Sequence, residues 1–178
     1  MENRMDSAGS RRDEQVWGFA PVAAPGARVL VLGSMPGVAS LRQARYYAHP
    51  RNAFWPLAGR IFGFDPGLDY PGRLQALQAC GVALWDVLQA CERPGSLDAD
   101  IRGDTLVPND FRAFLSVHPG IARVCFNGAK AAALYRRHVL PGLDGISLQY
   151  FELPSTSPAH AAASFDQKLA AWEPALKV

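Results

Sequence analysis

This chain of 178 residues contains few lysines and carries a small net charge. Its 18 basic residues include only three lysines, Lys130, Lys168 and Lys177, so few side chains can act as an amine nucleophile. The formal net charge of +2 is too small to predict nucleic-acid binding, although a local basic rim remains compatible with it. Charged residues make up 19% of the chain and hydrophobic residues 49%, which excludes a highly charged, disordered protein.

Cysteine is also rare, and the three cysteines, Cys80, Cys91 and Cys125, are far apart in the sequence. No C-x-x-C pair or Cys/His cluster occurs, which argues against a structural zinc site or a four-cysteine iron–sulfur cluster. No stretch approaches 18 apolar residues, so we expect no membrane span. The N-terminus has no apolar signal region, and we expect reduced thiols in a cytoplasmic protein.

The length predicts one domain. Residues 1–16 are polar and aperiodic, and we interpret them as a flexible N-terminal tail. Residues 17–178 then form a single α/β domain, which we expect to be monomeric.

Short apolar runs alternate with segments of helical periodicity from residue 28 onward. The predicted strands are 28–33, 82–86, 123–127 and 147–153. The predicted helices are 52–62, 73–80, 109–118, 128–139 and 161–172, and residues 92–107 read as a loop. This alternation predicts a three-layer α/β/α fold with a central, mainly parallel four-stranded sheet and helices on both faces.

In such a fold the ligand lies beyond the carboxyl ends of the strands. The first strand ends at Gly33-Ser-Met-Pro-Gly37, where a sharp bend exposes backbone N–H groups. The other exits are Asp86, Asn127-Gly128 and residues 154–160. Each exit is also compatible with an ordinary turn or helix cap.

One further segment beside these exits, and the last exit itself, carry polar or aromatic groups. Residues 46–55 contain Tyr47 and Asn52, which we interpret as functional, and Phe54 and Trp55, which we assign to the core. Residues 155–157 are Ser-Thr-Ser between two prolines, a rigid set of hydroxyls suited to a phosphate oxygen or to capping the next helix.

These segments together carry a family resemblance. Gly33-Ser-Met-Pro-Gly37, Tyr47-Ala-His-Pro-Arg-Asn-Ala-Phe-Trp55 and Leu153-Pro-Ser-Thr-Ser-Pro158 resemble motifs of the uracil-DNA glycosylase superfamily. Gly81–Asp86 and Phe126–Gly128 resemble two further strands of that family. The nearest branches are the hypoxanthine-DNA glycosylase-like and the mismatch-specific uracil/thymine glycosylases.

The resemblance implies a monofunctional DNA glycosylase of base excision repair that removes a deaminated base, hypoxanthine or uracil. Such an enzyme flips the nucleotide into a pocket and directs a water molecule to the anomeric carbon. Its partner is DNA containing the deaminated base, and the reaction requires no metal or other cofactor.

The resemblance also suggests which residues bind the base. Tyr47 is expected to stack on it, and the backbone around Gly33, Ser34 and Met35 to contact it. Asp86 is expected to accept the N–H of uracil or hypoxanthine, an N–H that cytosine and adenine lack. The alternative for Asp86 is a loop or helix cap.

Water placement is assigned to Asn52. Many family members carry Asp or Asn in the first motif for this purpose, and Met35, which occupies that position here, cannot do it. Asn52 lies in the second motif, and its amide oxygen can accept a proton of the water, although it can also cap the following helix. Asn127 is expected either to contact the base or to cap the helix after it.

The remaining candidates are assigned to the DNA backbone. Ser155, Thr156 and Ser157 are expected to clamp it, and His160 to lie at the rim. The arginines proposed for phosphate contact are Arg45, Arg51 and Arg93. We find no lysine near the expected pocket, and therefore expect no strand-cleaving lyase activity.

Two alternatives use the same residues differently. Ser34, Asn127 and His160 resemble the site of flavodoxin-like serine hydrolases, but Ser157 stands where an orienting Asp is needed and the G-x-S-x-G motif is absent. A DNA-binding module that has lost its chemistry is compatible with Met35. Such a module binds DNA in a salt-dependent way but yields no abasic sites.

Overall fold

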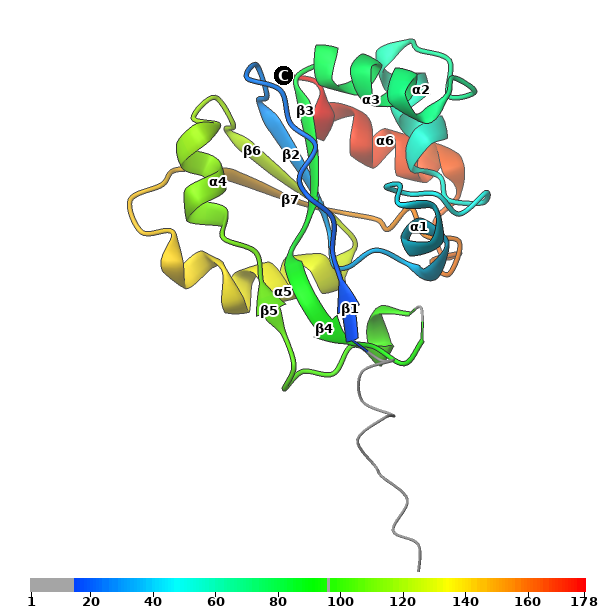
Figure 1. Ribbon diagram of the computed structural model, residues 1–178. Coiled ribbons are helices and arrows are strands. Elements are labelled where there is room, and N and C mark those ends of the chain that lie inside the picture. The colour runs from blue at the N-terminus through cyan, green and yellow to red at the C-terminus, as the bar shows by residue number, and fades with distance from the viewer. Residues whose placement is uncertain (1–14, 96) are drawn as a thin grey trace, which may run out of the picture.

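Four parallel strands form the central sheet of the computed structural model, which describes residues 15–95 and 97–178 (Figure 1). They are β2 (Val29–Gly33), β3 (Val82–Asp86), β6 (Arg123–Asn127) and β7 (Gln149–Leu153), arranged in the order β3-β2-β6-β7. All three pairings are parallel. The predicted fold class is confirmed, with β7 beginning two residues later than expected.

Alternate residues of β2 serve two separate hydrophobic cores, as the pleat of a strand requires. Leu30 and Leu32 pack toward α4 (Phe111–Val117) and α5 (Ala129–His138). Val29 and Val31 pack toward the opposite layer. That layer contains α2 (Phe54–Phe62), α3 (Tyr70–Ala79) and α6 (Phe165–Leu176). Figure 1 shows these helix layers on the two sides of the sheet.

Capping side chains set two helix starts that differ from our expectation. Asp110 caps α4, its carboxylate accepting from the Ala113 N–H, so the helix starts two residues after the expected residue 109. Ser164 begins α6 in a capping box with Gln167, so the helix starts four residues after the expected residue 161. The predicted positions of α2, α3 and α5 agree with the structure within a few residues.

A second, antiparallel sheet was not predicted. It has the order β1-β4-β5, from β1 (Gln15–Trp17), β4 (Leu88–Glu92) and β5 (Val107–Pro108). Residues 15 and 16, assigned to the tail, belong to β1, and the rest of the expected tail lies outside the described residues. In Figure 1 this sheet lies below the large one, where the chain passes directly from β3 into β4.

Three short helical segments were also missed. The helix α1 (Val38–Gln43) follows the first strand exit, and two 3₁₀ turns lie at Asp98–Asp100 and Leu140–Gly142. The two segments nearest the carboxyl ends of the strands, α1 and the Asp98–Asp100 turn, bear on the site described next.

Candidate functional site

A cavity of about 650 Å³ lies at the carboxyl ends of the four parallel strands. Of the candidate residues chosen from the sequence, all but Arg45 and Arg93 line it: Gly33, Ser34, Met35, Tyr47, Arg51, Asn52, Asp86, Asn127, Ser155, Thr156, Ser157 and His160. Residues from both halves of the chain therefore meet at one site, as the parallel topology predicts.

Asp86, the last residue of β3, has a deeply buried side chain that is 4% exposed. Its Oδ2 atom has no hydrogen-bonding partner within the described parts of the chain. A Cβ atom built on Gly33, its neighbour in the sheet, would lie 2.5 Å from Asp86 Oδ1. Glycine at position 33 thus leaves the space that the carboxyl group occupies, and Asn109 Nδ2 holds the Asp86 backbone carbonyl at 2.9 Å.

The ionisation of Asp86 is displaced by its surroundings. Burial and the negative charge of Asp98 raise the pKa of the Asp86 carboxyl to about 7, against a lowering by Arg93. Burial and the charge of Asp86 also raise the pKa of Tyr47 above its ordinary value. A buried carboxyl that titrates near neutrality in a cavity is a typical mark of a functional site.

Tyr47 has a strained backbone and a fixed ring. Its φ of 55° lies in the left-handed region, which non-glycine residues seldom adopt. Its ring packs on that of Phe54 with centroids 4.2 Å apart and planes tilted by 30°. Its buried hydroxyl has no hydrogen-bonding partner among the residues described. Phe54 and Trp55 are 1% and 3% exposed, which confirms their assignment to the core.

Asn52 is half-buried and precedes α2. Its Oδ1 atom accepts from the Phe54 N–H at 2.9 Å, but the N-cap of α2 is Ala53, so the expected alternative of Asn52 as the N-cap is wrong. The neighbouring Ala53 N–H donates to the Thr156 carbonyl at 2.9 Å. The second motif is thereby tied to the C-terminal loop, which we define as residues 154–160.

Three side chains form hydrogen bonds with the C-terminal loop. Asn127 Nδ2 donates to Thr156 Oγ1, and its Oδ1 accepts from the Thr156 N–H, both at 2.8 Å. Trp172 Nε1 donates to the Pro154 carbonyl at 2.9 Å, and Lys168 Nζ to the His160 carbonyl at 3.1 Å. The loop is therefore preorganised before any ligand binds.

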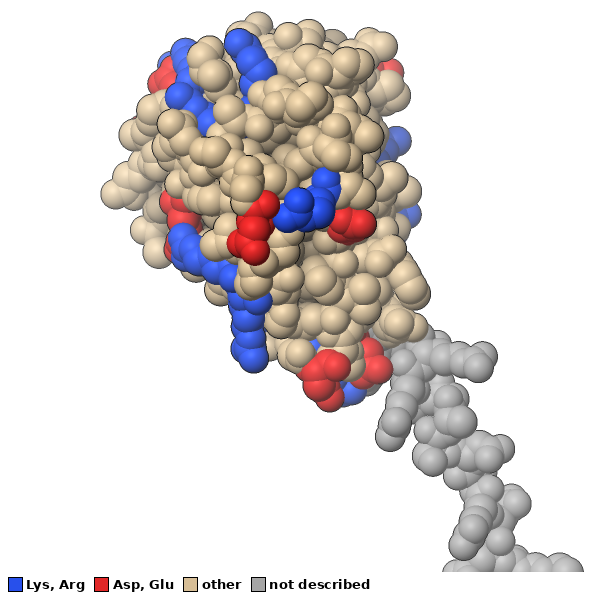
Figure 2. Space-filling view, turned by 90° about the vertical axis from the view of Figure 1, so that its left-hand side faces the viewer, with Lys and Arg blue, Asp and Glu red and all other residues tan. Residues whose placement is uncertain are grey.

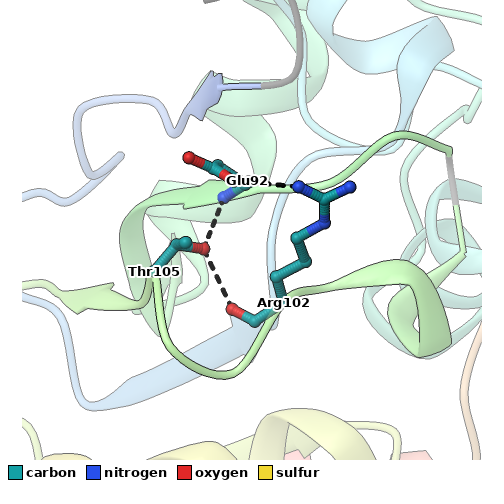
Figure 3. A network of polar contacts seen from close by, with 3 residues as sticks. All are labelled: Glu92, Arg102 and Thr105. Atoms are coloured by element: carbon teal, nitrogen blue, oxygen red, sulfur yellow. Dashed lines mark hydrogen bonds and ion pairs between the residues drawn. The ribbon is translucent and has the colours of Figure 1, made fainter. Parts of the chain in front are cut away.

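A second loop, the β4–β5 loop between Glu92 and Val107, closes the other side of the cavity. Figure 3 shows the contacts at its neck. Arg102 bonds the Glu92 carboxylate at 3.1 Å, while Thr105 Oγ1 accepts from the Glu92 N–H and donates to the Arg102 carbonyl, both at 2.9 Å. These bonds join the two ends of the loop.

Two residues of the β4–β5 loop bond the first motif. Arg93 is 3% exposed and donates to the Pro36 carbonyl. Its side chain is therefore buried against the first motif, and its expected role in phosphate contact is wrong. Asp98 accepts a hydrogen bond from the Ser34 hydroxyl. Ser34 is thus paired with a carboxylate rather than with a histidine, which disfavours the serine hydrolase alternative.

Several lining residues were missed from the sequence, among them Leu97, Asp98 and Lys130. Lys130 lies in the first turn of α5, so the expectation that no lysine approaches the pocket is wrong. The position of Lys130 three residues after Asn127 was a usable signal. No sequence signal pointed to Asp98, because it lies far from Ser34 in the sequence and only the fold brings the two residues together.

The rim of the cavity has a modest basic character. Arg51 and His160 are exposed there, and Lys130 is half-buried. Arg45 is exposed but does not line the cavity, and its guanidinium stacks over the Tyr70 ring. On the face shown in Figure 2, charges of both signs are scattered over a mostly uncharged surface.

Two further properties of the described residues concern metal binding and membrane-spanning helices. These residues contain no group of three or more His, Cys, Asp or Glu side chains placed to hold a metal ion. No helix within residues 15–95 and 97–178 has the length and apolar character needed to cross a membrane.

Comparisons with known proteins agree with the motifs. Residues 20–176 match the profile of the Uracil DNA glycosylase superfamily. The chain is 35% identical over 157 residues to the hypoxanthine DNA glycosylase of Methanosarcina acetivorans, covering 88% of this chain and 94% of that protein. It is 40% identical over 115 residues to the hypoxanthine DNA glycosylase of Methanosarcina barkeri, covering 64% and 72%.

The fold has a solved relative as well. A protein from Methanosarcina acetivorans, whose solution NMR structure was described as that of a candidate uracil DNA glycosylase, superposes with a TM-score of 0.77 at 33% identity. The match covers 92% of this chain and 97% of the other. The family match at residues 20–176 includes all four strands of the central sheet.

Proposed function

Because the chain belongs to the uracil DNA glycosylase superfamily, we propose that it removes a deaminated base from DNA by hydrolysing the N-glycosidic bond. The observation that carries this proposal is that residues of all four strand exits line one cavity. Two relatives named hypoxanthine DNA glycosylase make hypoxanthine the first substrate to test, with uracil the second.

In this proposal the flipped base lies between Tyr47 and the first strand exit. The Tyr47 ring, supported from behind by Phe54, provides a stacking surface. Backbone groups of Gly33, Ser34 and Met35 approach the base edge, and Asp86 reads it from the floor of the cavity. Asn127, whose side-chain amide already bonds Thr156, contributes by holding the wall in place.

Asn52 places the attacking water. Its Oδ1 atom accepts one hydrogen bond from the Phe54 N–H, and an amide oxygen has a second lone pair. A water bound there can be oriented toward the anomeric carbon, so the bond to the Phe54 N–H and water placement are compatible roles. The water contributes a hydroxyl to that carbon, and the departing base takes the electron pair of the broken C–N bond.

The rim contacts the DNA backbone. Arg51 and His160 are exposed for phosphate contact, and Ser155 and Ser157 are accessible in part. Thr156 is 1% exposed, so we assign it to positioning the C-terminal loop rather than to touching DNA. We further propose a cytoplasmic monomer, and the three free cysteines fit a reducing compartment.

The decisive experiment is a panel of labelled duplexes containing hypoxanthine, uracil, xanthine or thymine. Each duplex is incubated with the protein and then cleaved with alkali, which breaks the strand only at abasic sites. We expect product from the hypoxanthine duplex above all. Salt-dependent binding without product from any duplex would instead support the non-catalytic DNA-binding module.

Strand cleavage by the protein itself is a separate question. We propose that it lacks lyase activity, because attack by water requires no amine. Borohydride reduction during turnover is expected to trap no protein–DNA adduct. An adduct that forms with the native protein and not with Lys130→Ala would identify the cavity lysine as an amine nucleophile and contradict this part of the proposal.

A further inference from the structure

The Asp86 carboxyl has the surroundings of a ligand-binding group rather than of a structural one. It is 4% exposed, and one of its oxygens, Oδ2, bonds nothing in the described chain. Unpaired buried polar atoms are costly, and they are retained where a ligand supplies the missing bond. Because Asp86 lines the cavity and Gly33 has no side chain to cover it, that ligand can reach the carboxyl.

The charged and titratable groups that face Asp86 come from two segments. Asp98 approaches from the β4–β5 loop, and Tyr46 and Tyr47 from the segment before α2. Arg93, also from the β4–β5 loop, is the one cation that acts on it among the described groups, and its own hydrogen bond goes to the Pro36 carbonyl. Burial and Asp98 outweigh Arg93, so the pKa of Asp86 rises to about 7 and the protonated form is well populated near neutral pH.

We propose that Asp86 binds the flipped base as a neutral carboxylic acid. One oxygen accepts the N1–H of hypoxanthine, and the other donates its O–H to O6. This two-point contact fits any base that presents a lactam edge, an N–H beside a carbonyl, and uracil presents the same pair. The inference rests on the proposed function and specifies how that site recognises its substrate.

The neutral acid also favours the chemical step. As the C1′–N9 bond breaks, its electron pair moves into the base and negative charge develops on O6. An O–H donor at O6 stabilises that charge, whereas a carboxylate at the same place would repel it. Overall the water gives its hydroxyl to C1′ and its remaining proton to the departing base, so Asp86 ends the reaction with its own proton.

The test is the pH dependence of single-turnover excision from a deoxyinosine duplex. We expect the native rate constant to fall as pH rises through about 7, approaching about tenfold per pH unit above it. The variant Asp86→Asn keeps an acceptor and a donor but does not titrate. Its rate constant should stay level, so the ratio of variant to native should rise about 25-fold between about pH 6.5 and about pH 8.5.

The matched control is Asp104→Asn, which removes one negative charge from an exposed position of the same loop. Its profile should follow the native one. Native excision that is level through pH 7, or an equal fall in Asp86→Asn, would overturn the inference while leaving the proposed function intact. Absence of excision by the native protein at every pH would overturn both. The native profile alone decides the matter if Asp86→Asn does not fold.

Discussion

Asn127 and Thr156 are joined by two hydrogen bonds, each 2.8 Å long, between the end of β6 and the C-terminal loop. Both residues are buried, at 9% and 1% exposure. The pair uses the acceptor and one donor of the Asn127 amide, and it satisfies both the hydroxyl and the N–H of Thr156. It therefore fixes the position of the C-terminal loop relative to the end of β6.

Removing this amide should destabilise the protein. Asn127→Ala leaves two polar groups of Thr156 buried without a partner, and we expect the free energy of unfolding to fall by about 2–4 kcal/mol. Chemical denaturation measures this loss. The control is Thr156→Ser, which keeps the hydroxyl and should lose far less. An Asn127→Ala protein of native stability would show that the loop is held by other contacts.

Asn52 should be needed for excision more than for folding. Asn52→Ala removes the acceptor for the Phe54 N–H, at a cost of about 1 kcal/mol in stability, and it removes the proposed water site. We expect single-turnover excision to fall by about 100-fold or more, with DNA binding retained.

Asn52→Asp provides the matched comparison for stability, because a carboxylate accepts the same N–H and should preserve the melting temperature. If Asn52→Ala excises hypoxanthine at the native rate, the assignment of the water to Asn52 is wrong. The bond to the Phe54 N–H would then be the whole role of this side chain.

The ring of Tyr47 should matter and its hydroxyl should not. Tyr47→Phe keeps the packing on Phe54 and removes a hydroxyl that has no hydrogen-bonding partner in the described chain, so stability and excision should stay near native values. Tyr47→Ala removes the stacking surface and should weaken binding to deoxyinosine DNA by about 1–3 kcal/mol. Equilibrium titration of a labelled duplex measures this. Equal affinity in both variants would exclude Tyr47 as the stacking residue.

Asp98 should tune Asp86 through its charge. Asp98→Asn retains an acceptor for the Ser34 hydroxyl and removes the negative charge that raises the pKa of Asp86. The pKa of Asp86 should therefore fall, and the alkaline loss of excision should move to lower pH, by about one pH unit or less. A profile unchanged from the native one would mean that Asp98 acts on Asp86 only weakly.

The central sheet and the main lining of the cavity were predictable because their signals are local. Each strand is a short apolar run, and parallel strands must deliver their carboxyl ends to one edge, so Asp86 and Asn127 could be placed together before any coordinates. Glycine at position 33 was expected to allow a ligand to approach closely, and the structure shows that it also leaves space for the Asp86 carboxyl.

The β4–β5 loop was not predictable for the opposite reason. Its position depends on the pairing of β1 with β4, two segments more than 70 residues apart, and on the contact between Ser34 and Asp98. Arg93 looked like a surface cation, and only the folded loop shows that it is buried against Pro36. No periodicity within residues 92–107 signals either contact.

The raised pKa of Asp86 should also appear in the stability of the protein. Burial favours the protonated form, so the folded-state pKa of about 7 lies above the ordinary value of 3.8. Below pH 4 the carboxyl is neutral in both states and carries no penalty. As pH rises from about 4 to about 7, the unfolded chain ionises more readily than the folded one, and stability falls by about 1.4 kcal/mol for each pKa unit of difference. Asp86→Asn has no such charge, so its melting temperature should exceed the native one at about pH 8.5 and approach it at about pH 5. A difference in melting temperature that is the same at both pH values would show that the Asp86 carboxyl ionises normally in the folded protein.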